Sequence, residues 1–190
     1  MVILAGGKGQ RIGGGKPHVL FDGQRLIDHA MDLVSSWNCP IVISVHEPRQ
    51  VEQDRFPEIV DRTEVVGPLA GLLAAFAWAQ KEALAGFLTL PCDMPRLPVN
   101  CLARLQSGSE AADRPTVACC GERRHPVCAF WPVSYFDGVV AYAQTGRQSL
   151  FGALEATEAI DVYWPKGDED LFFNINQPHD LVGPRDCRAR

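Results

Sequence analysis

The chain opens with MVILAGGKGQRIGGGK, residues 1–16, and this stretch decides the fold. Its apolar run Val2–Leu4 predicts a short buried strand that leads directly into a loop of six glycines. Three cations, Lys8, Arg11 and Lys16, interrupt the glycines. Because glycine lets backbone N–H groups approach phosphate oxygens and cations attract them, the stretch predicts a polyphosphate-binding loop. The alternative is a flexible turn whose cations are solvated.

This loop differs from two familiar phosphate-binding motifs. A Walker A motif ends in Gly-Lys followed by Ser or Thr, whereas Pro17 follows Lys16 here. The dinucleotide fingerprint requires a further glycine at a fixed offset, and Gly7-Lys8-Gly9 lacks it. Pro17 predicts that the chain leaves the loop in an extended conformation. We expect Lys16 to be exposed in the empty protein.

Composition indicates one globular domain in the 190 residues, of which 46% are hydrophobic and 22% charged. We expect the domain to span residues 1–182, with a frayed tail over 183–190.

A net charge of −5 argues against nucleic-acid binding. No signal peptide and no apolar stretch of about 18 residues is visible, which predicts no membrane association. Seven cysteines without a C-x-x-C pair favour buried free thiols and a cytoplasmic protein.

Apolar periodicity along the chain alternates between strand and helix. This order predicts an α/β fold, a mostly parallel sheet with helices on both faces. The predicted strands are 2–4, 41–45, 59–60, 87–90, 116–119, 127–131 and 160–164. The predicted helices are 26–37, 69–84, 99–106, 133–143 and a short one that begins at Pro178.

Polar side chains follow several of the predicted strands at the point where each strand ends. Ser44 and His46 lie at the end of the second strand, and Asp61 and Asp93 follow the third and fourth. Ligands of such sheets bind outside the carboxyl ends of the strands. We therefore expect these residues and the glycine loop to converge on one edge of the sheet.

Asp93 is the strongest candidate for a metal ligand. It lies between two prolines in Leu90-Pro91-Cys92-Asp93-Met94-Pro95, and the prolines stiffen the loop. Mg²⁺ prefers one or two carboxylates together with phosphates and waters, so a carboxylate facing a phosphate loop suits it. The alternative is an aspartate that caps a turn.

A second glycine motif, Gly67-Pro68-Leu69-Ala70-Gly71, follows Asp61 and opens a helix. The N–H groups and the dipole at the start of this helix can contact an anion or the edge of a base. Gly71 inside the helix is unfavourable relative to Ala, which predicts that another group approaches it closely. The alternative is a glycine needed only for packing.

Five motifs occur in order along nearly the whole chain. They are Leu-Ala-Gly-Gly-x-x-x-Arg-Ile-Gly-Gly-x-Lys from Leu4, Gly-Pro-Leu-Ala-Gly from Gly67, Pro-Cys-Asp-Met-Pro from Pro91, His-Pro-Val from His125 and Asn-Ile-Asn-x-Pro from Asn174. Together they resemble the molybdenum cofactor guanylyltransferases of the MobA type. The resemblance implies a three-layer Rossmann-like nucleotidyltransferase fold. It also implies a reaction that joins GMP from GTP to molybdenum-bearing molybdopterin and releases pyrophosphate, with Mg²⁺ as cofactor.

The resemblance assigns roles to individual residues. Asp93 would hold Mg²⁺, Asp61 would recognise guanine or ribose, and Lys16 would bind the phosphates. The nucleotide would further contact Leu4, Ala5, Gly6 and Gly67. Ser44 stands where the family often has Asn, and Gly15 stands where many members carry an acidic residue. Asn174 and Asn176 match the segment of the pterin side, where Gln177 replaces the usual Thr.

In the implied reaction the phosphate of the pterin attacks a nucleoside triphosphate, and both are anions. The site must therefore mainly offset their negative charge. Arg11 and Lys16 would stabilise the charge that moves to the leaving pyrophosphate. An ionised phosphate attacks, so no histidine needs to act as a base. His125, in Arg123-Arg124-His125-Pro126, would clasp the phosphate of the pterin, or would lie in a solvated basic loop.

Two other functions stay open, besides a sugar-phosphate nucleotidyltransferase, which is generally a longer chain. A cytidylyltransferase acting on the same pterin is the first, although such relatives usually show Leu-Ala-Ala-Gly where this chain has Leu4-Ala5-Gly6-Gly7. A non-catalytic nucleotide-binding adaptor that delivers cofactor is the second, and the joint presence of Lys16 and Asp93 argues against it. Molybdoenzyme apoproteins or delivery chaperones are further candidate partners.

Overall fold

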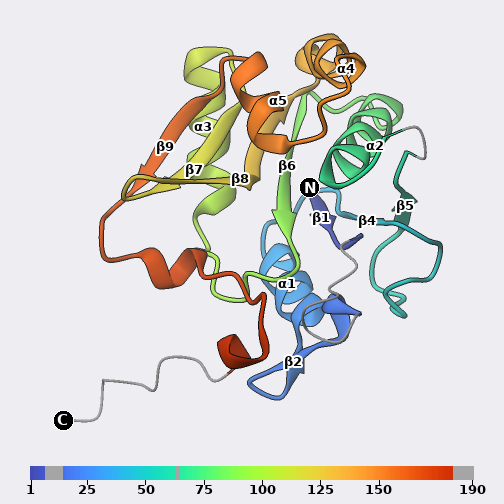
Figure 1. The fold of residues 1–190 in the computed structure, drawn as a ribbon, viewed down its shortest axis with the longest axis vertical. Helices are drawn as coiled ribbons and strands as arrows, with labels where there is room; N and C mark the ends of the chain where they lie inside the picture. Colours follow the sequence, from blue (N-terminus) through green and yellow to red (C-terminus); the bar gives the residue numbers. More distant parts are fainter. Residues whose placement is uncertain (7–14, 63–64, 182–190) are drawn as a thin grey trace.

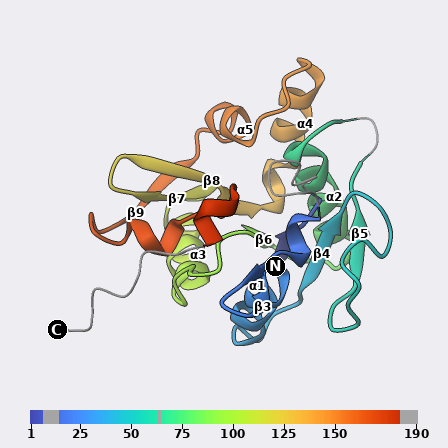
Figure 2. The same cartoon turned by 60° about the horizontal axis from the view of Figure 1, so that its bottom comes forward.

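The computed structural model describes residues 1–6, 15–62 and 65–181, and these residues form a sheet between two layers of helices (Figures 1 and 2). Seven described strands follow the order β5-β4-β1-β6-β8-β7-β9. Their bounds are β1 (Val2–Leu4), β4 (Val42–Val45), β5 (Glu58–Val60), β6 (Gly86–Pro91), β7 (Thr116–Cys120), β8 (Arg123–Pro132) and β9 (Ile160–Trp164). Only β8 among them runs antiparallel to its neighbours β6 and β7.

The two faces of the sheet bury alternate residues of each strand. In β1, Ile3 packs with the helices α1 (Leu26–Ser35) and α3 (Cys101–Ala112), while Val2 packs on the opposite face. That face is covered by α2 (Pro68–Lys81), α4 (Phe136–Gln144) and α5 (Leu150–Ala156). Figure 2 shows α4 and α5 on one side of the sheet and α1 and α3 on the other. The predicted α/β class is confirmed.

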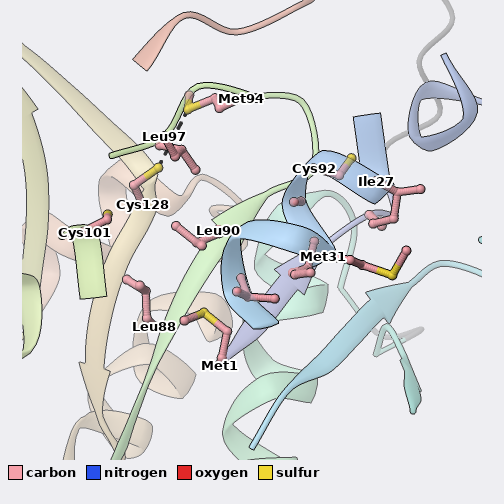
Figure 3. Close-up of a cluster of buried hydrophobic side chains, with 14 of the residues drawn as sticks. Met1, Ile27, Met31, Leu88, Leu90, Cys92, Met94, Leu97, Cys101 and Cys128 are labelled. Carbon is pink, nitrogen blue, oxygen red and sulfur yellow. Dashed lines mark hydrogen bonds between the residues drawn. The ribbon is translucent and has the colours of Figure 1, made fainter. Parts of the chain in front are cut away.

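The core beneath α1 and α3 is rich in sulfur (Figure 3). The Sγ atom of Cys128 lies 3.8 Å from the Sδ atom of Met94, and Cys101 is buried in the same cluster. Burial raises the pKa of the Cys101 thiol to about 12, so this thiol stays protonated. All six cysteines in the described residues are free, and five are buried, as the sequence predicts.

Most predicted elements are found with shifted ends. The helix predicted over 99–106 continues to Ala112, because the left-handed residue that ends it is Asp113, at φ 52°. The strand predicted over 127–131 begins at Arg123, since Ala118–Cys120 of β7 pair with Arg123–His125. α5 was not predicted. Its seven residues are too few for a clear periodicity, although Ser149 Oγ caps it by accepting the Gly152 N–H at 2.9 Å.

The segment after the glycine loop differs from the prediction. Lys16–His18 form a single 3₁₀ turn, η2, which begins after Gly15 in the left-handed conformation, at φ 59° and ψ 41°. The extended conformation predicted at Pro17 is therefore wrong. The fixed φ of proline also suits the first turn of a helix, and here the turn prevails. A hairpin that was not predicted follows, formed by β2 (Leu20–Phe21) and β3 (Gln24–Arg25).

The last described segment folds back towards the start of the chain. It contains the short turns η4 (Glu169–Phe172) and η5 (Pro178–Leu181), and Figure 1 shows η5 close to the β2–β3 hairpin. Ile175 is buried against Phe21 and Leu26, and its N–H donates to the Asp93 carbonyl at 2.9 Å. This return brings Asn174 and Asn176 to the loop after β6. The predicted tail 183–190 lies outside the described residues. No helix in the described part of the chain is long and apolar enough to cross a membrane.

Candidate active site

A cavity of about 600 Å³ opens at the carboxyl ends of β1, β4, β5 and β6. The predicted convergence of these strand ends is confirmed. Predicted residues that line the cavity are Leu4, Gly6, Lys16, Ser44, His46, Asp61, Gly67, Gly71 and Asp93. Arg11, and with it most of the glycine loop, lies outside the described residues. The volume is in the range of sites that hold a small ligand.

Lys16 and Asp93 form an ion pair at the floor of this cavity. The side chains are only 15% and 9% exposed. The Lys16 Nζ also donates to Asn176 Oδ1 at 2.7 Å and to Asn174 Oδ1 at 3.4 Å. The expectation of an exposed Lys16 is therefore wrong. A carboxylate buried after β6 needs a counter-ion, and η2 presents Lys16 to supply it.

The carboxyl group of Asp93 has one oxygen without a partner. Burial raises its pKa, while the charge and hydrogen bond of Lys16 act in the opposite direction. Oδ1 is buried and accepts no hydrogen bond from the described residues. A carboxylate oxygen without a donor, on a residue that lines the cavity, fits Mg²⁺, which needs few protein ligands. No group of three His, Cys, Asp or Glu in residues 1–6, 15–62 and 65–181 is placed to hold a metal alone. Phosphates and waters would complete its coordination.

Asp61 forms a second, separate polar pair on the wall of the cavity. Ser44 Oγ donates to Asp61 Oδ1 at 2.5 Å. Burial raises the pKa of Asp61, while the hydrogen bond from Ser44 and the nearby His46 oppose that rise. A Cβ atom added at Gly71 would lie 2.7 Å from Ser44 Oγ, and one at Gly6 would lie 2.6 Å from Asp61 Oδ2. The close approach predicted at Gly71 is confirmed, and Gly6 makes another.

The start of α2 borders the same cavity. Gly67 precedes the helix with φ 77° and ψ −163°, a backbone conformation that only glycine adopts readily. Gly67, Pro68 and Ala70 all line the cavity. The dipole of α2 therefore favours negative charge at this wall. The geometry offers a nucleotide two polar contacts, one at Asp61 and one at the pair of Lys16 with Asp93.

Comparison with known proteins identifies the family. The model of the MobA-like NTP transferase domain matches residues 1–159. The chain belongs to this family. The molybdenum cofactor guanylyltransferase of Cereibacter sphaeroides is 32% identical over 190 residues, covering 95% of this chain and 92% of the relative. The molybdenum cofactor guanylyltransferase of Pseudomonas syringae is 33% identical over 198 residues, covering 100% and 94%.

Solved structures agree with this MobA-like assignment. Molybdopterin-guanine dinucleotide biosynthesis protein A from Archaeoglobus fulgidus is 25% identical, with a TM-score of 0.76 over 95% of this chain and 94% of that one. A CMP:2-keto-3-deoxy-manno-octonic acid synthetase complexed with CTP is 12% identical, with a TM-score of 0.72 over 95% and 94%, and shows the fold alone. The predicted Rossmann-like nucleotidyltransferase fold and the predicted enzyme class are confirmed.

The pterin-side residues of the MobA-like chain differ in their surroundings. Asn174 and Asn176 meet Lys16 beside the cavity. His125 is buried away from the cavity lining and stacks on Phe172, with ring centroids 4.6 Å apart. Burial and the nearby Arg123 lower the pKa of His125 to about 4, so its ring is uncharged at neutral pH. An uncharged, covered ring is poorly suited to clasp a phosphate, and we leave His125 out of the proposed site.

Arg62, Val65, Val66 and Val127 line the cavity of the MobA-like chain and were not predicted, and neither was Gln50, which does not line it. Gln50 Nε2 donates to the Ala5 carbonyl at 3.2 Å, and Gln50 Oε1 accepts the His46 N–H at 2.7 Å. These bonds join the loop after β1 to the loop after β4. A single glutamine in a polar loop carries no motif, so nothing in its sequence context indicates this contact.

Proposed function

We propose that this protein transfers GMP from GTP to molybdenum-bearing molybdopterin and releases pyrophosphate. The observation that carries the proposal is the buried Asp93 with its free Oδ1, paired with Lys16 in a cavity bordered by Gly6. Such a pair suits a polyphosphate with a bound cation. The curated relatives named molybdenum cofactor guanylyltransferase support the choice of nucleotide and acceptor.

The nucleotide would lie along the strand ends. Asp61, held by Ser44 and backed by Gly6, would accept hydrogen bonds from guanine or from the ribose. Leu4, Gly6 and Gly67, which line the cavity, would bound the nucleoside, and the buried Ala5 would support them from behind. The triphosphate would point to Lys16 at the floor, where Arg11 of the glycine loop is the second cation we propose.

The transfer makes one bond and breaks one. A phosphate oxygen of the pterin attacks the α-phosphorus of GTP, and the bond from that phosphorus to the oxygen bridging to the β-phosphate breaks. The attacking oxygen is already ionised, so no protein base takes a proton. Lys16 and Arg11 stabilise the charge on the departing pyrophosphate. Lys16 donates hydrogen bonds to Asn174 and Asn176, and with the acceptor bound on their side this lysine would lie between the two substrates.

We propose Mg²⁺ as the cofactor, with Asp93 as its protein ligand. When bound, the ion supplies positive charge that offsets the negative charge of the phosphates. The free Oδ1 of Asp93 supports this assignment, since it is a buried acceptor without a donor. The free thiols of the described residues support a reducing compartment, and we propose the cytoplasm. Molybdoenzyme apoproteins or delivery chaperones would receive the product.

The second candidate, a cytidylyltransferase, differs at the position of Gly6. Such relatives usually carry Ala there, and an added Cβ would lie 2.6 Å from Asp61 Oδ2 and 3.3 Å from the His46 nitrogen. In this chain that methyl group would displace Asp61 from the wall. The close approach of Gly6 to Asp61 therefore favours the guanylyl function. The ion pair of Lys16 with Asp93 argues against a non-catalytic adaptor, because such an adaptor does not need this pair.

Nucleotide choice is tested by thermal unfolding with GTP, CTP and ATP, each with Mg²⁺ at equal concentration. We expect GTP to stabilise the protein most. At about 100 times the dissociation constant, binding adds roughly 2.7 kcal/mol, or roughly 5–10 °C in a domain of this size. Repeating the scan with EDTA controls for the metal. An equal or larger shift with CTP would favour the cytidylyl function instead.

A further inference from the structure

Gln50 lies behind the wall of the cavity and not among the residues that line it. Its side chain makes three hydrogen bonds to backbone. Nε2 donates to the Ala5 carbonyl at 3.2 Å, and Oε1 accepts the N–H groups of His46 at 2.7 Å and Glu47 at 3.2 Å. One half-buried amide therefore spans the loop that follows β1 and the loop that follows β4.

The two joined loops are those that form the nucleotide wall. A Cβ atom added at Gly6 would lie 3.3 Å from the His46 nitrogen and 2.6 Å from Asp61 Oδ2, so the backbone at Gly6 is already close to both. Gly6 and His46 line the cavity, and Gln50 bonds to the backbone of His46 and of Ala5, the neighbour of Gly6. A change in the spacing of these loops would move the surface that a nucleoside contacts.

Gln50 also reaches the segment that carries the phosphate-binding lysine. The backbone carbonyl oxygen of Gln50 lies 3.0 Å from His18 Nε2, and His18 ends the η2 turn that begins at Lys16. The N–H of His18 in turn donates to the Gly15 carbonyl at 2.8 Å. A single residue thus contacts the nucleoside wall through its side chain and the phosphate side through its backbone.

We propose that Gln50 is a positioning residue for the nucleotide: its side-chain amide fixes the spacing between Ala5-Gly6 and His46 before the nucleotide binds. It does not contact the reacting atoms. The correct loop spacing stabilises the bound nucleotide and the transition state equally. Its loss therefore weakens nucleotide binding without lowering kcat. This inference rests on the proposed function.

The same loop contains a matched control. Gln53 also makes three side-chain hydrogen bonds to backbone. Its Nε2 donates to the Phe56 carbonyl at 2.7 Å, and its Oε1 accepts the N–H groups of Arg55 at 2.8 Å and Phe56 at 2.9 Å. None of these partners lines the cavity. Gln53 therefore contributes to the order of the loop without touching the nucleotide wall.

The experiment compares Gln50→Met with Gln53→Met, since methionine keeps the volume of glutamine and removes its polar atoms. The dissociation constant of GTP with Mg²⁺ is measured by calorimetry without acceptor, and kcat and KM are measured with molybdenum-bearing molybdopterin. For Gln50→Met we expect the dissociation constant and the KM for GTP to rise roughly tenfold, which corresponds to the loss of about one hydrogen bond. We expect kcat to stay within about twofold of wild type. For Gln53→Met we expect the dissociation constant and the KM for GTP to stay within about twofold of wild type.

Two results would overturn the inference. One is unchanged GTP affinity in folded Gln50→Met, and the other is an equal loss of affinity in both variants, which would indicate loop stability alone. Melting temperatures of the two variants verify that both proteins are folded in the binding assay, so that a change in affinity does not reflect partial unfolding. Failure of the proposed function is distinct, since wild type itself would then bind GTP no better than CTP.

Discussion

Asp93→Asn should lower the rate of GMP transfer by about 10²-fold or more while the protein stays folded. Asparagine keeps the shape of the side chain and removes the charge that pairs with Lys16 and that would anchor Mg²⁺. Losing one electrostatic contributor of this kind costs roughly 3 kcal/mol in the transition state. The rate is measured at saturating GTP and Mg²⁺, with far-UV circular dichroism to verify folding.

Asp28→Asn is the matched control for this variant. Asp28 accepts two hydrogen bonds of 2.7 Å from Arg25, so the substitution also breaks a partly buried ion pair, but in α1 and away from the cavity lining. We expect its transfer rate to stay within about twofold of wild type. Near-normal turnover of Asp93→Asn would show that the metal is held elsewhere and that the pair at the cavity floor is structural.

Lys16→Met should damage both transfer and stability. Transfer should fall by about 10²-fold, because a cation that lines the cavity and would face the triphosphate is lost. Stability should fall as well, since removing one partner of a buried ion pair leaves an uncompensated charge, at a cost of about 3–5 kcal/mol unless that charge is neutralised. Lys16→Arg should recover only part of the rate, because a planar guanidinium does not reproduce the compact ammonium.

The loss of stability should depend on pH. Burial already raises the pKa of Asp93 above its ordinary value of about 3.9, and Lys16 opposes that rise. Without Lys16 the folded protein keeps a proton that the unfolded chain releases, so the free energy of unfolding decreases as pH rises above about 4. We expect the loss relative to wild type to be larger at pH 8 than at pH 5, by urea unfolding.

The double variant Lys16→Met with Asp93→Asn identifies the source of this effect. It should recover most of the stability at pH 8 and remove the pH dependence, while remaining inactive. If Lys16→Met instead costs less than about 0.5 kcal/mol at both pH values, Lys16 is a solvated surface lysine and the ion pair does not form in solution.

The architecture and the location of the site were predictable from local signals. Apolar runs such as Val2–Leu4 and 87–90 indicated the strands. Because ligands of such sheets bind outside the carboxyl ends of the strands, Ser44, Asp61 and Asp93 could be predicted to lie on one edge. Gly71 was also predictable, because a helix tolerates glycine poorly unless another group approaches closely.

The parts that were not predictable depend on contacts between distant segments. The antiparallel direction of β8 leaves no mark on its apolar pattern. His125 reads as part of a basic loop, but β8 begins at Arg123, and the alternation of the strand turns His125 inward onto Phe172. Lys16 reads as exposed because its partners Asn174 and Asn176 lie about 160 residues further along the chain. Gln50 carries no signal of its own.

We propose that the protein transfers GMP from GTP in the cavity at the strand ends, and this transfer can be measured. It is tested most directly by incubating the purified protein with molybdenum-bearing molybdopterin, Mg²⁺ and either GTP or CTP, and measuring pyrophosphate together with the dinucleotide product. We expect pyrophosphate and molybdopterin guanine dinucleotide in equal amounts with GTP, little product with CTP, and almost none with GTP in Asp93→Asn. Faster product formation with CTP than with GTP, or undiminished turnover in Asp93→Asn, would contradict it.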